Sequence, residues 1–119
     1  MKYMKDWKRS LQLENKINQR LYGMLGFAMR AGKVIIGTDL VCRAMPTGRV
    51  KLVIVSSAAS DSTKKKLFVK SDYYSISAIE VDIDTERLGD LLGKSCALAA
   101  VAVTDDGFAA EIKKATVLN

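Results

Sequence analysis

Short apolar runs alternate with longer amphipathic segments along almost the whole chain. Each run has three to five residues and contains Val, Ile or Ala, and the runs 52–55 and 99–103 are uniformly apolar, as is typical of buried strands. The segments between the runs place apolar residues at helical spacing. Strand and helix in regular alternation predict a three-layer α/β/α sandwich around a largely parallel sheet. The four expected strands are 34–36, 52–55, 77–81 and 99–103.

Capping residues and one proline set the expected helix boundaries. Gly32 ends the first helix, and Pro46 should shorten or distort the second one near its end, because proline cannot donate the helical hydrogen bond. Ser, Thr and Asp side chains accept hydrogen bonds from the free amides of a first helical turn. The expected helices are therefore 15–31, 38–45 with Thr38 as N-cap, 61–72 after Ser60 or Asp61, 85–92 with Thr85 as N-cap, and a last one that begins at Thr104 or Asp105.

The length of the chain fits one domain. It has 119 residues, of which 49% are hydrophobic, and this is enough for one complete core but not for two. We expect a single domain over residues 15–119. Residues 1–14 then form an N-terminal extension, which is a further helical turn, a flexible arm or a partly non-native addition.

The sequence offers no segment for a membrane or for export. No apolar run approaches the roughly 20 residues that a membrane helix needs. The first ten residues lack the apolar centre of a signal peptide. We therefore expect a cytoplasmic protein with no membrane partner.

The residues that build common catalytic and metal sites are missing. The chain contains no histidine, and its two cysteines, Cys42 and Cys96, form no CxxC pair. This argues against a zinc site and against histidine acid–base catalysis. The phosphate-binding and nucleophile motifs GxGxxG, GxxxxGKS/T and GxSxG are also absent. We expect no enzymatic activity, no metal and no cofactor.

Positive charge is concentrated in the first part of the chain. The net charge is +6, but residues 1–70 carry 15 Lys and Arg against 4 Asp and Glu, whereas residues 71–119 carry 4 against 9. A field of one sign over one surface captures a polyanion. Charge runs are also commonly plain solvated faces, so the pattern favours a polyanionic partner without requiring one.

Three sequence blocks together resemble a known family. They are LGFAMRAGKVIIGTDLVCRAM (25–45), KLVIVSSAASDSTKKK (51–66) and LGDLLGKSCALAAVAVTDDGFA (88–109). Their order and spacing are similar to those of the L7Ae and L30e ribosomal protein superfamily, and more narrowly to its bacterial YlxQ-like branch. The resemblance implies an L30e-like α/β/α sandwich around a four-stranded mixed sheet. It also implies binding of kinked or otherwise structured RNA, such as ribosomal RNA, rather than catalysis.

The resemblance places RNA contacts at the turn into the second helix. A helix start presents free N–H groups and a partial positive charge, which suit a phosphate or a base edge. Kink-turn readers of the family generally carry Asn and Glu where this chain has Asp39 and Leu40, so kink-turn recognition stays open. Thr38 and Asp39 are also interpretable as plain helix caps. The matching positions are Gly37, Thr38, Asp39, Leu40 and Arg43.

A loop and two groups of cations complete the expected RNA surface. In the family that the chain resembles, the loop before the last strand also faces RNA, and here it is small-sided and suits a flipped-out base, with Lys94 near the backbone. Gly93 and Lys94 are also interpretable as a plain helix end. Arg30 and Lys33 are expected to form one positive wall with Arg43 beside the Gly37 turn, and Cys42 and Cys96 to fill space as small apolar side chains. The loop residues are Lys94, Ser95, Cys96 and Ala97, and the third helix adds Lys64, Lys65 and Lys66 as phosphate contacts.

The expected partner is a structured, presumed ribosomal RNA bound by a monomer. Contacts with basic ribosomal proteins are also open, because the second half of the chain is acidic. Two alternatives remain. One is a protein-interaction module of the same fold that has lost specific RNA binding, and the other is a small enzyme, which the missing motifs disfavour.

Overall fold

Four strands form one sheet in the order β1–β4–β2–β3. The computed structural model describes residues 19–116. β4 is antiparallel to both of its neighbours, β1 and β2, and β2 and β3 are parallel. The sheet is therefore mixed. The strands are β1 (Val34–Ile36), β2 (Leu52–Ser56), β3 (Ser77–Val81) and β4 (Ala100–Val103).

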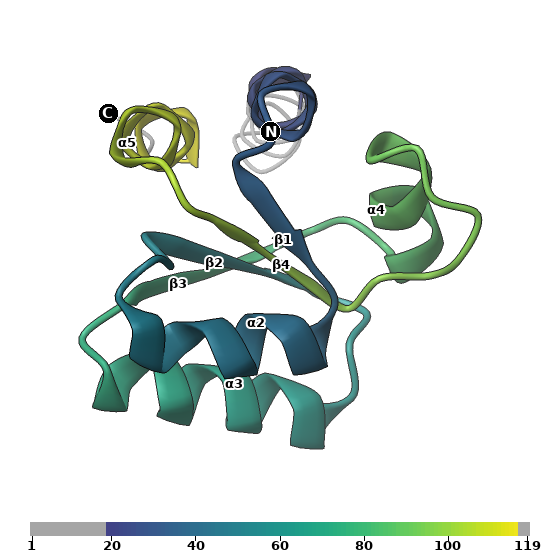
Figure 1. Cartoon of the computed structure of the whole chain (residues 1–119). Coiled ribbons are helices and arrows are strands. Elements are labelled where there is room, and N and C mark those ends of the chain that lie inside the picture. Colours follow the sequence, from purple (N-terminus) through teal and green to yellow (C-terminus); the bar gives the residue numbers. More distant parts are fainter. Residues whose placement is uncertain (1–18, 117–119) are drawn as a thin grey trace, which may run out of the picture.

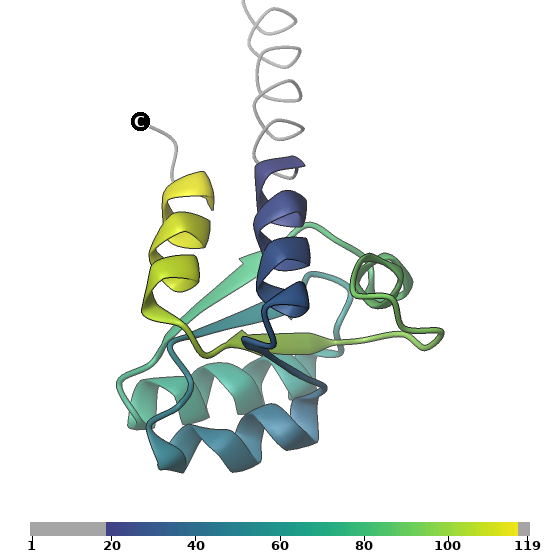
Figure 2. The same ribbon diagram turned by 45° about the horizontal axis from the view of Figure 1, so that its top comes forward.

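Helices cover both faces of this sheet. The helix over residues 19–30 and α5 lie on one side, and α2 and α3 lie on the other (Figure 1). α4 lies beyond the sheet on the first side, near the end at which β3 stops (Figures 1 and 2). This arrangement is the expected three-layer sandwich. The elements are α2 (Thr38–Ala44), the short 3-10 helix η1 (Met45–Thr47), α3 (Asp61–Tyr73), α4 (Thr85–Leu91) and α5 (Asp106–Thr116).

Each face of the sheet has its own buried core, because successive strand side chains point to opposite faces. Leu52 and Ile54 of β2 pack with the helix over residues 19–30, α4 and α5. Val53 and Val55 of the same strand pack with α2 and α3. All five residues of β2 are buried, since this strand is central and covered on both faces.

The alternation of strands and helices predicted a largely parallel sheet, and this prediction is wrong. β1, β2 and β3 run in one direction, but β4 runs in the other between β1 and β2. The physical reason is the position of α4. This seven-residue helix does not carry the chain back across the sheet, so β4 begins at the edge where β1 and β2 end (Figure 1).

The helix caps are confirmed in part. The Ser60 side chain accepts a hydrogen bond from the Thr63 amide, as expected. Asp84, not Thr85, caps α4 by accepting from the Arg87 amide at 2.7 Å. Thr38 does not cap α2, since glycine occupies the N-cap position and no side chain is bonded there.

The proline turn is confirmed. Pro46 falls in η1, a tighter 3-10 turn that replaces the end of the second helix. Gly48 closes the turn with a left-handed backbone at φ 78°, a conformation that glycine adopts at little cost. The bend directs the chain from α2 into β2.

Part of the expected organisation lies outside the described residues. The expected helix start near Asn15 and the N-terminal extension over residues 1–14 fall there. Between residues 19 and 116, no helix has both the length and the apolar character needed to cross a bilayer.

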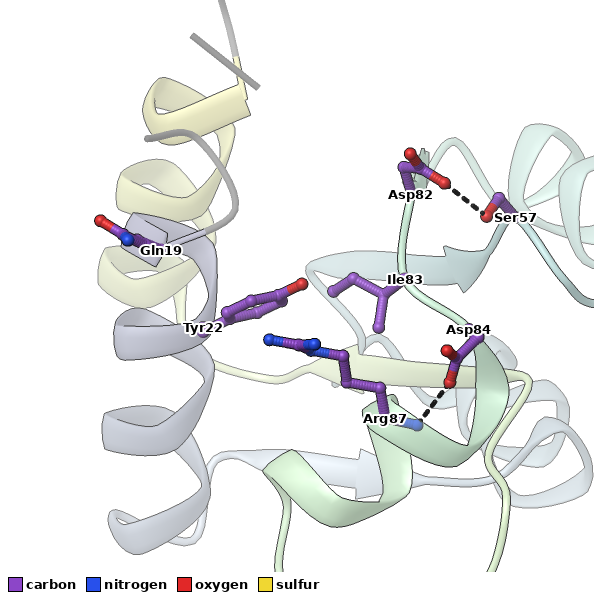
Figure 3. Close-up of a pocket in the computed structure, with 7 residues that line it drawn as sticks. All are labelled: Gln19, Tyr22, Ser57, Asp82, Ile83, Asp84 and Arg87. Atoms are coloured by element: carbon purple, nitrogen blue, oxygen red, sulfur yellow. Dashed lines mark hydrogen bonds between the residues drawn. The ribbon is translucent and has the colours of Figure 1, made fainter. Parts of the chain in front are cut away.

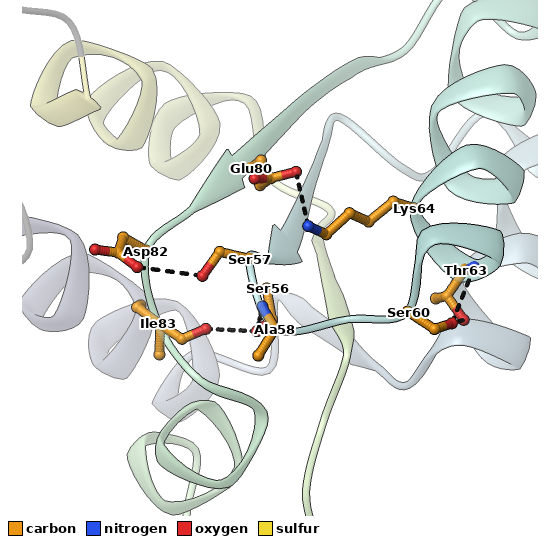
Figure 4. A network of polar contacts seen from close by, with 9 residues as sticks. All are labelled: Ser56, Ser57, Ala58, Ser60, Thr63, Lys64, Glu80, Asp82 and Ile83. Carbon is orange, nitrogen blue, oxygen red and sulfur yellow. Dashed lines mark hydrogen bonds and ion pairs between the residues drawn. The ribbon is translucent and has the colours of Figure 1, made fainter.

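Two buried serines differ in how their hydroxyl groups are satisfied. Ser56, at the end of β2, donates to the Ile83 carbonyl and accepts from the Ala58 amide (Figure 4). Ser71 of α3 is 1% exposed, and its hydroxyl has no partner among the described residues. The first hydroxyl joins β2 to the segment after β3, whereas the second pays a desolvation cost without compensation.

These serines give a matched pair of stability tests. Ser56→Ala should lower the free energy of unfolding by about 1–3 kcal/mol, because the buried Ile83 carbonyl loses its donor. Ser71→Ala should leave that free energy unchanged or raise it by up to about 1 kcal/mol. Urea unfolding monitored by circular dichroism measures both, and equal losses in the two variants would contradict the assignment.

Candidate functional site

The turn into α2 is built around Gly37. Its φ of 94° and ψ of 146° lie in a region that favours glycine. The Gly37 amide donates to the Ala100 carbonyl at 3.1 Å, and its carbonyl accepts from the Val41 amide at 3.0 Å. Thr38 is half-buried, whereas Asp39 and Leu40 are exposed. The turn thus presents its first helical residues outward without a side-chain cap.

The loop between α4 and β4 is fastened to α4 by its backbone. The Lys94 and Leu98 amides donate to the carbonyls of Gly89 and Thr85, both at 2.9 Å. A Cβ on Gly89 would lie 1.9 Å from the Cys96 carbonyl oxygen, so only glycine permits this close approach. The loop residues Lys94, Ser95, Cys96 and Ala97 are all exposed.

The structure brings the turn and the loop together at one end of the strands, where β1 ends and β4 begins. This location is called the edge with the Gly37 turn. β4 begins at Ala100, directly after the loop, and its first carbonyl holds the Gly37 amide. Figure 1 shows the start of α2 next to the chain that enters β4. Two sequence-predicted elements that are more than fifty residues apart in the chain therefore share one surface.

The predicted cations separate into two groups. Arg43 is exposed on α2, one turn after the Gly37 turn. Arg30 lies on the helix over residues 19–30, across the sheet, with its guanidinium 5.0 Å from the Phe27 ring. Lys33 precedes β1 and its carbonyl accepts from the Thr104 amide at 2.9 Å, whereas Gly37 follows β1. The structure therefore does not bring Arg30 and Lys33 beside the Gly37 turn with Arg43.

The lysines of α3 also differ from one another. Lys64 forms an ion pair with Glu80 of β3 at 3.5 Å (Figure 4). Sequence patterns did not indicate this pair, because Glu80 reaches α3 through the parallel pairing of β2 and β3. Lys65 and Lys66 are exposed. The ion pair with Glu80 therefore explains the charge of Lys64 within the protein. Lys65 and Lys66 remain as candidate phosphate contacts.

Cys42 and Cys96 occupy different environments. Cys42 is 5% exposed and packs in the core under α2, as expected of a small apolar side chain. Cys96 is exposed in the loop, so the expectation that it fills space is wrong. The reason is the close contact of its backbone with Gly89, which leaves the thiol outside.

Charge is segregated between the segment with α2 and α3 and the segment with α4 and α5, while the helix over residues 19–30 carries Arg20 and Arg30 and no acidic residue. Residues 37–77, which include α2 and α3, carry seven Lys and Arg against three Asp and Glu. Residues 78–116, which include α4 and α5, carry four Lys and Arg against eight Asp and Glu. A polyanion is therefore attracted to the α2 and α3 side and repelled from the α4 side.

A hollow of about 490 Å³ lies on the acidic side, between the helix over residues 19–30 and α4 (Figure 3). The Arg87 guanidinium lies 5.4 Å from the Tyr22 ring, and the Ser57 hydroxyl donates to the Asp82 carboxylate at 3.2 Å. No sequence-predicted site residue lines this hollow. Its lining residues are Gln19, Tyr22, Ser57, Asp82, Ile83, Asp84 and Arg87.

Comparison with known proteins assigns most of the chain to one family model. Residues 19–113 match the model of the ribosomal protein L7Ae/L30e/S12e/Gadd45 family. The RNA-binding protein YlxQ of Bacillus subtilis is 42% identical over 88 residues, which are 74% of this chain and 86% of that protein. The large ribosomal subunit protein eL30 of Sulfolobus acidocaldarius is 31% identical over 91 residues, 76% of this chain and 88% of that protein.

A solved structure agrees with these matches. A Bacillus halodurans protein of unknown function superposes with a TM-score of 0.76 at 34% identity. The superposition covers 81% of this chain and 95% of that one. The sheet and the covering helices are therefore shared with a natural relative over nearly its full length.

Gly89 gives a direct test of how the loop is held. Gly89→Ala should lower the free energy of unfolding by about 1–3 kcal/mol, because the new methyl group collides with the Cys96 carbonyl. Gly23→Ala is the control, since a Cβ at this position would meet nothing within 4 Å. Alanine stabilises a helix by up to about 1 kcal/mol relative to glycine, so this variant should be at least as stable as the parent chain. Urea unfolding of both variants measures the difference. Equal stability of the two variants would show that the loop is free to move away from α4.

Proposed function

The chain belongs to the ribosomal protein L7Ae/L30e/S12e/Gadd45 family, and from this premise we propose that it is a non-enzymatic protein that binds structured RNA as a monomer. The similarity to a protein named RNA-binding protein YlxQ and to ribosomal protein eL30 supports this class of partner. The RNA is a kink-turn or a similarly bent element, and ribosomal RNA is the natural source.

One observation carries the placement of the RNA. The Gly37 turn and the loop over residues 94–97 lie on one edge of the sheet, joined through the hydrogen bond from Gly37 to Ala100. Structured RNA is recognised where its backbone bends and its unpaired bases are splayed out. A surface with an exposed helix start on one side and a small-sided, fastened loop on the other fits such a bend.

The charge distribution sets the direction from which the RNA approaches. Arg43, Lys65 and Lys66 are exposed on the α2 and α3 side, where they contact phosphates. Asp82, Asp84, Glu86 and Asp90 are exposed on and before α4 and repel phosphates. The RNA therefore crosses the Gly37 turn toward α2, and Lys94 marks the boundary of the contact. Arg30 and Lys33 have no role in this arrangement unless the RNA also reaches the far end of β1.

Asp39 modifies recognition without excluding it. Its exposed carboxylate accepts hydrogen bonds from guanine N–H groups but repels nearby phosphates. Leu40 beside it offers only apolar contact. The expected affinity therefore depends more on phosphate contacts, and on salt, than in a reader with an amide and a carboxylate at these two positions.

Removal of single cations tests this surface. Arg43→Ala and Lys94→Ala should each weaken binding to a kink-turn RNA and reduce the slope of log affinity against log salt by about one unit, because each removes one phosphate contact. Lys114→Ala is the control, since Lys114 lies on α5 across the sheet, 3.5 Å from Glu111. Filter binding at several salt concentrations measures the slopes. A salt-independent affinity, or an equal effect of Lys114→Ala, would contradict the proposal.

A further inference from the structure

A groove lies between α2 and β1, which is one of the two outer strands of the sheet. Its volume is about 290 Å³, which is at the small end for a ligand site and suits one planar group rather than a large ligand. Among the strands of residues 19–116, β1 pairs with β4 alone, so no described strand lies on its outer side. The groove is lined by Ile35, Leu40, Arg43, Ala44, Thr47 and Arg49.

The lining of the groove includes apolar side chains that are open to solvent. Leu40 is 54% exposed, one of four large hydrophobic side chains among residues 19–116 that are exposed in this way. Leu40, Arg43 and Ala44 are three and four residues apart on α2, so they lie on one face of the helix. Ile35 of β1 is half-buried and also lines the groove. Binding of a ligand that removes such an exposed apolar surface from water is favourable.

The turn after α2 adds a second arginine to the lining of the groove. Pro46 tightens the chain into η1, and the left-handed Gly48 reverses it. The Thr47 hydroxyl donates to the Ala44 carbonyl and accepts from the Arg49 amide at 3.3 Å. These contacts fix the backbone of Arg49, which the sequence did not single out, next to the groove that Arg43 also lines.

The charges of Arg43 and Arg49 are not neutralised by an ion pair within the described part of the chain. Among residues 19–116 neither Arg43 nor Arg49 has a carboxylate within ion-pair distance. A guanidinium plane stacks on a flat ring and forks two hydrogen bonds to a phosphate. A groove lined by apolar side chains and two such groups matches the parts of a nucleotide, which are a flat base and flanking phosphates.

We propose that this groove binds one unpaired nucleotide of the RNA, with the base on Leu40 and Ile35 and the adjoining phosphates on Arg43 and Arg49. This inference rests on the proposed RNA binding and deepens it. It adds Arg49 and the apolar face of Leu40 to the contact surface. It also extends the RNA from the Gly37 turn along α2 toward η1.

The experiment compares two RNAs and four variants of the full chain. The first RNA is a stem with a kink-turn that leaves nucleotides unpaired, and the second is the same stem fully paired. Leu40→Ser removes the apolar side chain of Leu40, Leu40→Met retains an apolar side chain there, Arg49→Ala removes one charge of the groove, and Lys114→Ala is the charge control. Leu40 and Arg49 are exposed, so the melting temperatures should stay close to that of the parent chain.

Leu40→Ser and Arg49→Ala should each weaken binding to the kinked RNA about three- to tenfold, in proportion to the loss of one apolar or one charge-assisted contact. Arg49→Ala should also reduce the salt slope by about one unit. Leu40→Met and Lys114→Ala should bind like the parent chain. A 2-aminopurine placed at the unpaired positions should change its fluorescence on binding to the parent chain, and less on binding to Leu40→Ser.

Several outcomes separate this inference from the proposed function. Normal binding of the kinked RNA by Leu40→Ser and Arg49→Ala, with salt-dependent binding by the parent chain, would overturn the groove and retain RNA binding. Equal weakening toward both RNAs would show that the groove contacts the backbone alone, which also overturns the role of a base. No salt-dependent binding of either RNA by the parent chain would overturn both proposals.

Discussion

The insertion of β4 between β1 and β2 is the constraint on which the rest of this structure depends. β4 runs against both neighbours, so the chain must reach it from the edge where β1 and β2 end. The hydrogen bonds at that edge join Ala100 to Gly37 and Ala99 to Ser56. As a result, the loop that precedes β4 and the turn that follows β1 lie on one surface, which is the surface proposed for RNA.

The fold also separates positive from negative charge. This separation determines toward which side of the Gly37 turn a bound polyanion is attracted. Helices α2 and α3 belong to the cationic part of the chain and cover one face of the sheet, while α4 and α5 belong to the acidic part and lie on the other side (Figure 1). The edge with the Gly37 turn lies between these two sides. A polyanion bound there is drawn toward α2. Arg43 and Arg49 stand on this path, and the hollow near Arg87 does not.

Sequence patterns predicted the layers but not the contacts between distant residues. Strand alternation and helical spacing are local signals, and the structure confirms them. The resemblance to the L7Ae and L30e superfamily and its YlxQ-like branch, which implied the mixed sheet, is also confirmed. The direction of β4, the ion pair of Lys64 with Glu80 and the contact of Gly89 with Cys96 all arise from tertiary packing. The same limit explains why Lys33 was expected beside Gly37, although a strand separates them, and why Arg49 was missed.

Amide chemical-shift mapping of the full chain with a kink-turn RNA would locate the surface that the RNA contacts. Each backbone amide reports separately, so the bound surface is located without mutation. If RNA binds the proposed surface, the largest changes fall on residues 37–43 and 94–98, with smaller ones along η1, and α5 is unchanged. Largest changes at residues 82–87 or on α5, with residues 37–43 unaffected, would contradict binding at that surface.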